Sequence, residues 1–120
     1  MNQIIIADDD SSMRDIFQLI LQRAGYAVTL YADGEILLGN EFKIPDLFIL
    51  DKQLSGVDGL DICRFLKNQE STKNIPVIII SASPYVANFA SDAGANDFIE
   101  KPFKTKELLE TVKKYITYSE

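Results

Sequence analysis

The sequence predicts an α/β fold in which a parallel sheet is covered by helices on both faces. Short runs of aliphatic and β-branched residues alternate with amphipathic helical patterns along the whole chain. Strands that are almost entirely apolar are typical of sheets buried on both sides, and such sheets are parallel. Each strand pattern is followed by a helix pattern, so we expect a (βα)5 arrangement with right-handed crossovers.

The first strand and the first helix are the most clearly marked elements. The strand is the aliphatic run 4–7. The helix extends from Ser11 or Ser12 to Ala24, because its apolar residues recur on one helical face. These residues are Met13, Ile16, Phe17, Ile20, Leu21 and Ala24. Either serine can cap the helix, and Gly25 is placed to end it.

Four further pairs of a strand and a helix follow. The strands are 27–31, 47–50, 77–80 and 97–99, and the helices are Asp33 to about Phe42, Asp58–Asn68, Pro84–Ala93 and Thr105 to about Thr117. The first of these helices is weakened by Gly34 and Gly39. Pro84 suits the first turn of its helix, and Gly94 is placed to end that helix.

Length, composition and charge exclude several classes of function. The chain has 120 residues, 47% of them hydrophobic, and no linker or repeat, so we expect a single domain over 1–120 with no output domain. The net charge of −6 opposes direct binding to nucleic acid, and no apolar stretch is long enough for membrane insertion. Histidine is absent, which excludes a histidine base. The single cysteine, Cys63, fits a cytoplasmic protein and a buried position.

Reactive side chains follow the predicted strands directly. Asp8–Asp10, Asp51, Ser81 and Lys101 each come immediately after an apolar run. The carboxyl ends of parallel strands meet at one edge of a sheet, where open α/β sheets bind ligands. Crowded carboxylates at such an edge favour a hard divalent cation such as Mg²⁺, and a lysine supplies a point charge for phosphate. The set therefore predicts a site for a cation and a phosphoryl group.

Each of these residues taken alone has an ordinary structural explanation. Asp8–Asp10 would cap a helix, Asp51 would cap a loop, Ser81 would end a strand, and Lys101 would be a solvated charge. The functional interpretation depends on all of them occurring together. The bond between Lys101 and Pro102 is a candidate cis peptide, because X-Pro bonds adopt cis at appreciable frequency.

Five segments carry a resemblance to a known family. They read IIIADDD at 4–10, PDLFILD at 45–51, DG at 58–59, PVIIISA at 76–82 and GANDFIEKPF at 94–103. In order, spacing and strand context they resemble the receiver domain of two-component response regulators, over essentially the whole chain. The resemblance implies a flavodoxin-like fold with strand order 2-1-3-4-5 and a site beside the switch point between the first and third strands.

The resemblance also implies a role for each reactive residue. Asp51 is implied to be the phosphoacceptor, Lys101 the phosphate-binding lysine and Ser81 the switch hydroxyl. Phe98 matches the switch aromatic that turns inward as Ser81 moves toward the phosphate; its ordinary alternative is a core position in a strand. The implied ligands of Mg²⁺, or of Mn²⁺ in its place, are Asp8, Asp9, Asp51 and the backbone carbonyl of Gln53. Asp9 is expected to bind directly and Asp8 through water.

Two positions depart from the family pattern. Ser55 stands four residues after Asp51, where the family usually has proline, and Gly56 follows it. The switch hydroxyl is Ser81 where threonine is commoner, which keeps the oxygen. The family is expected to tune dephosphorylation at the positions of Gln53 and Ser83, and both are polar and uncharged here.

The implied function is a phosphorylatable signalling switch rather than a metabolic enzyme. The implied phosphodonor is a sensor histidine kinase or a histidine phosphotransfer protein. Tyr85, Val86 and Phe89 form a candidate apolar patch near Phe98. We therefore expect the fourth helix, fifth strand and last helix to bind a downstream protein, or a second copy in a homodimer.

Two alternatives remain at this point. The first is an interaction module that keeps the fold but does not depend on phosphorylation. The second is a phosphatase of the haloacid dehalogenase type, with Asp8 as nucleophile and Asp10 as general acid. That family is longer and carries a cap insertion, and this assignment leaves Asp51 without a role.

Overall fold

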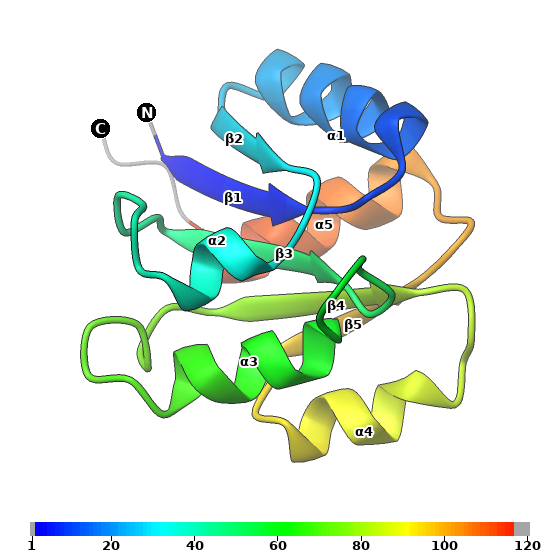
Figure 1. The fold of residues 1–120 in the computed structure, drawn as a ribbon. Coiled ribbons are helices and arrows are strands. Elements are labelled where there is room, and N and C mark those ends of the chain that lie inside the picture. The colour runs from blue at the N-terminus through cyan, green and yellow to red at the C-terminus, as the bar shows by residue number, and fades with distance from the viewer. Residues whose placement is uncertain (1, 117–120) are drawn as a thin grey trace.

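Five parallel strands form one sheet in the order β2-β1-β3-β4-β5 in the computed structural model, which describes residues 2–116 (Figure 1). The strands are β1 (Gln3–Ala7), β2 (Ala27–Tyr31), β3 (Leu47–Asp51), β4 (Val77–Ser81) and β5 (Asp97–Glu100). The predicted α/β class, strand number and strand order are confirmed. Asp51 and Ser81 are the last residues of their strands. The predicted strands 47–50 and 77–80 each end one residue earlier.

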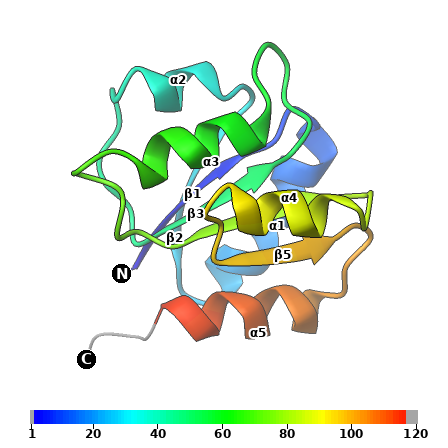
Figure 2. The same ribbon diagram turned by 90° about the horizontal axis from the view of Figure 1, so that it is seen from below.

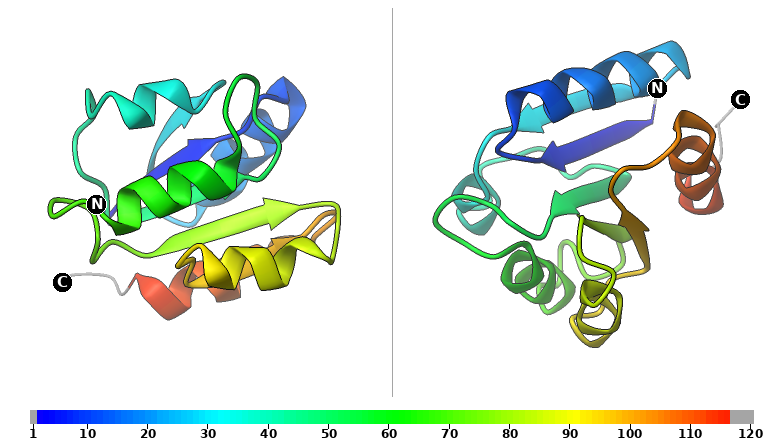
Figure 3. Two further views of the ribbon diagram at one scale, coloured as in Figure 1. Left: turned by 60° about the horizontal axis from the view of Figure 1, so that its bottom comes forward. Right: turned by 90° about the vertical axis from the view of Figure 1, so that its right-hand side faces the viewer.

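Helices cover both faces of this sheet, as predicted (Figures 2 and 3). The helices are α1 (Ser11–Arg23), α2 (Glu35–Leu38), α3 (Gly59–Lys67), α4 (Val86–Asp92) and α5 (Thr105–Tyr115). Side chains of α1 and α5 pack with Ile4 and Ile6 of β1 in one core cluster. Side chains of α2, α3 and α4 pack with Ile5 and Ala7 in the other. The alternation along β1 is the period-two pattern of a strand buried on both sides.

The start of α1 differs from the prediction. Neither Ser11 nor Ser12 is the N-cap; instead the carboxylate of Asp10 accepts hydrogen bonds from the backbone N–H groups of Ser12 and Met13, at 2.9 and 3.4 Å. Aspartate and serine are about equally good caps, so the sequence does not separate them. The end of α1 is as predicted, with Gly25 at a φ of 96°.

Two other helices, α2 and α4, differ from their predicted bounds by a few residues. The predicted helix from Asp33 to Phe42 contains only the single turn of α2, because Gly34 and Gly39 stand at its two ends. Helix α4 begins at Val86, two residues after Pro84, and ends before Gly94 as expected. The predicted end of α5 at Thr117 lies outside the described residues.

Cys63 is on α3 and its side chain is buried in the core, as expected for a small hydrophobic side chain. Its Sγ is 3.5 Å from the carbonyl oxygen of Ala93. Burial raises the pKa of the thiol to about 11, so the reactive thiolate is scarce at neutral pH. Within residues 2–116, no helix is long and apolar enough to span a membrane.

Candidate functional site

The carboxyl ends of β1, β3, β4 and β5 bring the reactive residues to one edge of the sheet (Figure 1). Asp8 follows β1, and its backbone N–H donates to the carbonyl of Tyr31 at 3.0 Å. Asp51 ends β3, and Ser81 ends β4. Lys101 follows β5, and its N–H donates to the carbonyl of Ser81 at 2.9 Å. The sheet therefore assembles residues that are up to 93 positions apart in sequence.

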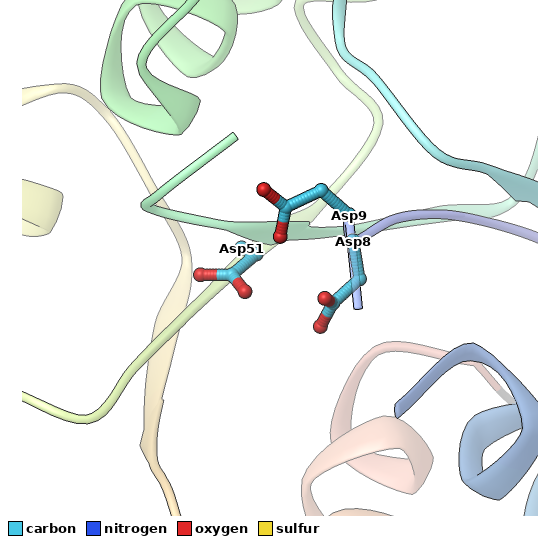
Figure 4. A group of neighbouring side chains, drawn as sticks. All are labelled: Asp8, Asp9 and Asp51. Atoms are coloured by element: carbon cyan, nitrogen blue, oxygen red, sulfur yellow. The ribbon is translucent and has the colours of Figure 1, made fainter. Parts of the chain in front are cut away.

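Three carboxylates form the centre of this edge (Figure 4). Asp8, Asp9 and Asp51 each place a carboxylate oxygen within 4.8 Å of the others. Asp8 is 1% exposed and Asp51 is 9% exposed, whereas Asp9 lies at the surface. Three converging carboxylates with one open side suit Mg²⁺, which prefers hard oxygen ligands and keeps part of its water shell. The donor set therefore fits the predicted metal.

Lys101 supplies a positive charge to two of these carboxylates. Its Nζ lies 2.7 Å from Oδ2 of Asp51 and 3.1 Å from Oδ2 of Asp8. Burial by itself would lower the pKa of Lys101, but the hydrogen bond and the charge of Asp51, followed by those of Asp8, raise it. The ammonium therefore stays protonated across the physiological pH range and opposes the repulsion between the carboxylates.

Asp8 is the most deeply buried acid of the three. Burial raises its pKa, and the nearby charge of Asp51 acts in the same direction. The N–H of Asp10 and the ammonium of Lys101 lower it in part. A carboxylate in this position gains more from a bound cation than a solvated one does, because the cation offsets the cost of its burial.

Backbone N–H groups fix two of the carboxylates. The N–H of Asp10 donates to Oδ1 of Asp8 at 2.9 Å, and the N–H of Gln53 donates to Oδ1 of Asp51 at 3.0 Å. The third carboxylate has a different donor: Oγ of Ser55 lies 3.3 Å from Oδ2 of Asp9. In the sequence, Ser55 is marked only as a departure from the family pattern. The sole signal for this contact was a hydroxyl in the loop after β3.

Gly59 brings the start of α3 against the end of β3. A Cβ atom at this position would overlap the carbonyl oxygen of Asp51 and would lie 3.0 Å from Cα of Lys52. The N–H of Gly59 donates to the carbonyl of Lys52 at 2.8 Å. Asp58 caps α3 through a 2.8 Å hydrogen bond to the N–H of Leu60. The Asp-Gly pair at 58–59 therefore supports the backbone that carries Asp51.

Ser81 ends β4 and Phe98 lies on β5, and their switch roles remain predictions. Oγ of Ser81 accepts a hydrogen bond from the N–H of Ser83 at 3.1 Å, which leaves the hydroxyl proton available to another acceptor. Phe98 pairs with Ile79 across β4 and β5 and packs partly buried against the cluster that contains α4. Both the switch and the core interpretations of Phe98 are compatible with a half-buried ring.

Three further predictions have different outcomes. Asp10 caps α1 and does not join the carboxylate cluster, so it is not positioned as the partner acid of a phosphatase. The Lys101-Pro102 peptide is cis, as expected. The carbonyl of Gln53 as a metal ligand remains a prediction.

An exposed apolar patch lies on α4. The side chains of Tyr85 and Phe89 are 80% and 56% exposed, whereas Val86, the third predicted member, is buried. Helices α4 and α5 lie on either side of the edge strand β5 (Figure 2). Phe98 belongs to this edge strand, and a partner surface formed by α4, β5 and α5 remains a prediction.

Comparison with known proteins agrees with this geometry. The family model described as "Response regulator receiver domain" matches residues 4–113. The chain is similar to CheY4, a chemotaxis response regulator of Vibrio cholerae, with a TM-score of 0.88, 27% identity, and coverage of 97% of this chain and 99% of that one. It is similar to the response regulator TrrA of Thermotoga maritima, solved in complex with Mg(2+)-BeF, with a TM-score of 0.87, 30% identity, and coverage of 97% and 100%.

Among full-length proteins the chain is similar to RpaA of Synechocystis sp., a DNA-binding dual master transcriptional regulator. The two are 36% identical over 118 residues, which cover 94% of this chain and 48% of RpaA. The chain thus spans about half the length of the regulators that it matches. The match to the family model over most of the chain, together with the shared fold, shows that it belongs to the receiver domains of response regulators, whose standard function is that of a phosphoacceptor switch in two-component systems.

Proposed function

We propose that the carboxylate of Asp51 is the phosphoacceptor of this switch. The observation that carries the proposal is the position of Asp51 in the carboxylate cluster, with Oδ2 only 2.7 Å from Nζ of Lys101. A carboxylate attacks phosphorus effectively where positive charge neutralises the transferring oxygens. Asp51 is 9% exposed, so one side remains open to a donor while the rest is held by the sheet.

The chemistry is the transfer of a phosphoryl group between two proteins. An oxygen of Asp51 forms a bond to phosphorus while the P–N bond of a phosphohistidine breaks, and the donor's imidazole leaves. Receiver domains of response regulators interact with histidine kinases, and this chain has no histidine of its own. The donor is therefore a histidine kinase or a histidine phosphotransfer protein. We expect Lys101 to shift its hydrogen bond from Asp51 to a phosphoryl oxygen, and Ser81 to donate its hydroxyl proton to another.

Asp8, Asp9, Asp51 and the backbone carbonyl of Gln53 would hold Mg²⁺, and Mn²⁺ would suit the same oxygen ligands. When bound, the ion supplies positive charge that stabilises the transferring phosphoryl oxygens. The residues that hold it also set its place beside Asp51. Asp8, paired with Lys101, lies on the buried side of the cluster, and Asp9 lies on the solvent side.

The output of the switch is a change in protein contacts. Phosphorylation draws Ser81 toward the phosphoryl group, and the half-buried ring of Phe98 turns further inward, which reshapes the surface of α4, β5 and α5. Tyr85 and Phe89 give this surface exposed apolar contacts for a downstream protein or for a second copy of the chain. The proposed location is the cytoplasm, where an unpaired Cys63 is stable as a thiol. The net charge of −6 opposes direct contact of this surface with nucleic acid.

Beryllium fluoride, a stable mimic of a phosphoryl group on a carboxylate, tests this proposal without a kinase. We expect the unfolding temperature to rise with Mg²⁺ and to rise further with Mg²⁺ plus beryllium fluoride, because both ligands bind only the folded chain. Asp51→Asn should abolish the second rise. Beryllium fluoride without Mg²⁺ should have no effect on either protein. An equal rise in Asp51→Asn would place the phosphoryl site elsewhere.

The same variants separate the two alternative functions. A phosphatase that uses Asp8 would hydrolyse a simple phosphomonoester, would keep that activity in Asp51→Asn and would lose it in Asp8→Asn. An interaction module independent of phosphorylation would signal normally with Asp51→Asn. The position of Asp10 at the N-terminus of α1 speaks against the phosphatase, which needs this acid beside the leaving group.

A further inference from the structure

We infer that Ser55 is a positioning residue that orients the carboxylate of Asp9 toward Mg²⁺, an inference that rests on the proposed function. Oγ of Ser55 lies 3.3 Å from Oδ2 of Asp9, across 46 positions of sequence. The proline that usually stands at this place in the family has neither a hydroxyl nor an N–H. The contact is therefore made by a residue in which this chain departs from the family pattern.

Asp9 is the carboxylate of the cluster that most needs an orienting donor. Asp8 and Asp51 are buried, and each is held by a backbone N–H and by Lys101. Asp9 is exposed, and Lys101 does not reach it. Within the part of the chain that the structure describes, Ser55 is the group that donates to the Asp9 side chain. A donor on Oδ2 would leave Oδ1 available to a cation and would reduce the side-chain freedom that Asp9 loses on binding it.

The loop between β3 and α3 holds Ser55 in place for this contact. Its base is closed by the ion pair of Lys52 and Asp58, with Nζ and Oδ2 2.9 Å apart. Gly56 takes a φ of 84°, and a Cβ atom there would lie 3.1 Å from Oε1 of Glu35 on α2. Glycine is thus the residue that permits both the turn and the approach of Glu35. The loop is bounded on two sides, and the hydroxyl of Ser55 faces the end of β1.

The expected size of the effect follows from the exposure of the pair. Loss of a partner that orients a metal ligand typically weakens metal binding about 10- to 100-fold in buried sites. The Ser55–Asp9 contact is exposed and, at 3.3 Å, is long for an O–H···O hydrogen bond. We therefore expect Ser55→Ala to weaken Mg²⁺ binding about three- to tenfold, below that range.

The test is a titration of Mg²⁺ into the unphosphorylated chain, followed by amide chemical shifts. The series contains the wild type, Ser55→Ala and Ser55→Thr, which keeps the hydroxyl. Ser71→Ala is the matched control, because Ser71 is an exposed serine in the segment between α3 and β4, at the opposite edge of the sheet. We expect weaker binding for Ser55→Ala, recovery to within about twofold for Ser55→Thr, and no change for Ser71→Ala.

A second readout separates orientation of Asp9 from a general effect on the loop. The free energy of unfolding of the metal-free protein should be the same for the wild type and Ser55→Ala, because an exposed hydroxyl contributes little to stability. Equal Mg²⁺ affinity in the wild type and Ser55→Ala, or tighter binding in the variant, overturns this inference and leaves the proposed function intact. A wild type that binds no Mg²⁺ overturns both.

Discussion

Replacing Lys101 by methionine is expected to slow Mg²⁺-dependent phosphorylation by acetyl phosphate about a hundredfold. Loss of one preorganised donor from a site that stabilises developing charge typically slows the reaction by roughly 10²–10³. Nζ of Lys101 lies 2.7 Å from Asp51 and 3.1 Å from Asp8, which places it beside any group transferred to Asp51. Methionine has a similar length and no charge, so the packing of β5 against β4 is kept. The measurement is the rate at which the intact mass increases by one phosphoryl group.

Mg²⁺ binding by the same variant should be unchanged or tighter. The ammonium of Lys101 contacts two of the carboxylates that hold the ion, so it competes with the ion for their charge. Lys106→Met is the control, because Lys106 is exposed on α5 and pairs only loosely with Glu110, at 3.8 Å. A wild-type rate for Lys101→Met would mean that Lys101 neutralises the resting acids and takes no part in the transfer.

Replacing Gly59 by alanine is expected to lower the free energy of unfolding by about 3 kcal/mol, the upper end of the usual cost of overpacking. The added Cβ would overlap the carbonyl oxygen of Asp51, and the atoms it meets are backbone atoms of Asp51 and Lys52 at the end of β3. They cannot move aside without disturbing the central strands of the sheet. The gain of roughly 1 kcal/mol in helix propensity does not offset this cost. Unfolding in urea measures the difference.

Gly39→Ala is the matched control for Gly59→Ala. Gly39 ends α2 at a φ of −82°, and the nearest atom to an added Cβ is the carbonyl oxygen of Ile36, at 3.6 Å. This variant should unfold at the same urea concentration as the wild type, or slightly higher. If Gly59→Ala also unfolded at the wild-type concentration, α3 would be free to move away from β3, and Gly59 would not be what supports Asp51.

The sheet and its reactive edge could be predicted because they depend on strong, simple signals. Runs such as Val77–Ile80 are buried on both faces, and a parallel sheet has few ways to order five such strands. Once the order is fixed, Asp51, Ser81 and Lys101 must lie at one edge. The ion pair between Lys101 and Asp51 is consistent with that shared edge.

Local details were less predictable because several residues compete for one role. Asp10, Ser11 and Ser12 are all good helix caps, and the choice of Asp10 depends on how β1 leads into α1. The contact of Ser55 with Asp9 depends on the path of the loop after β3, which the sequence marks only by Gly56. Such contacts join distant segments through a single atom pair, so no periodic pattern of residues in the sequence predicts them.

The central claim is that Asp51 accepts a phosphoryl group with the help of Mg²⁺. Its most direct test is the intact mass of the wild type and of Asp51→Asn after incubation with acetyl phosphate, with and without Mg²⁺. We predict one phosphoryl group on the wild type, dependent on Mg²⁺ and absent from Asp51→Asn. An adduct of equal yield on Asp51→Asn, or a wild type that gains no phosphoryl group and binds no Mg²⁺, would contradict the claim.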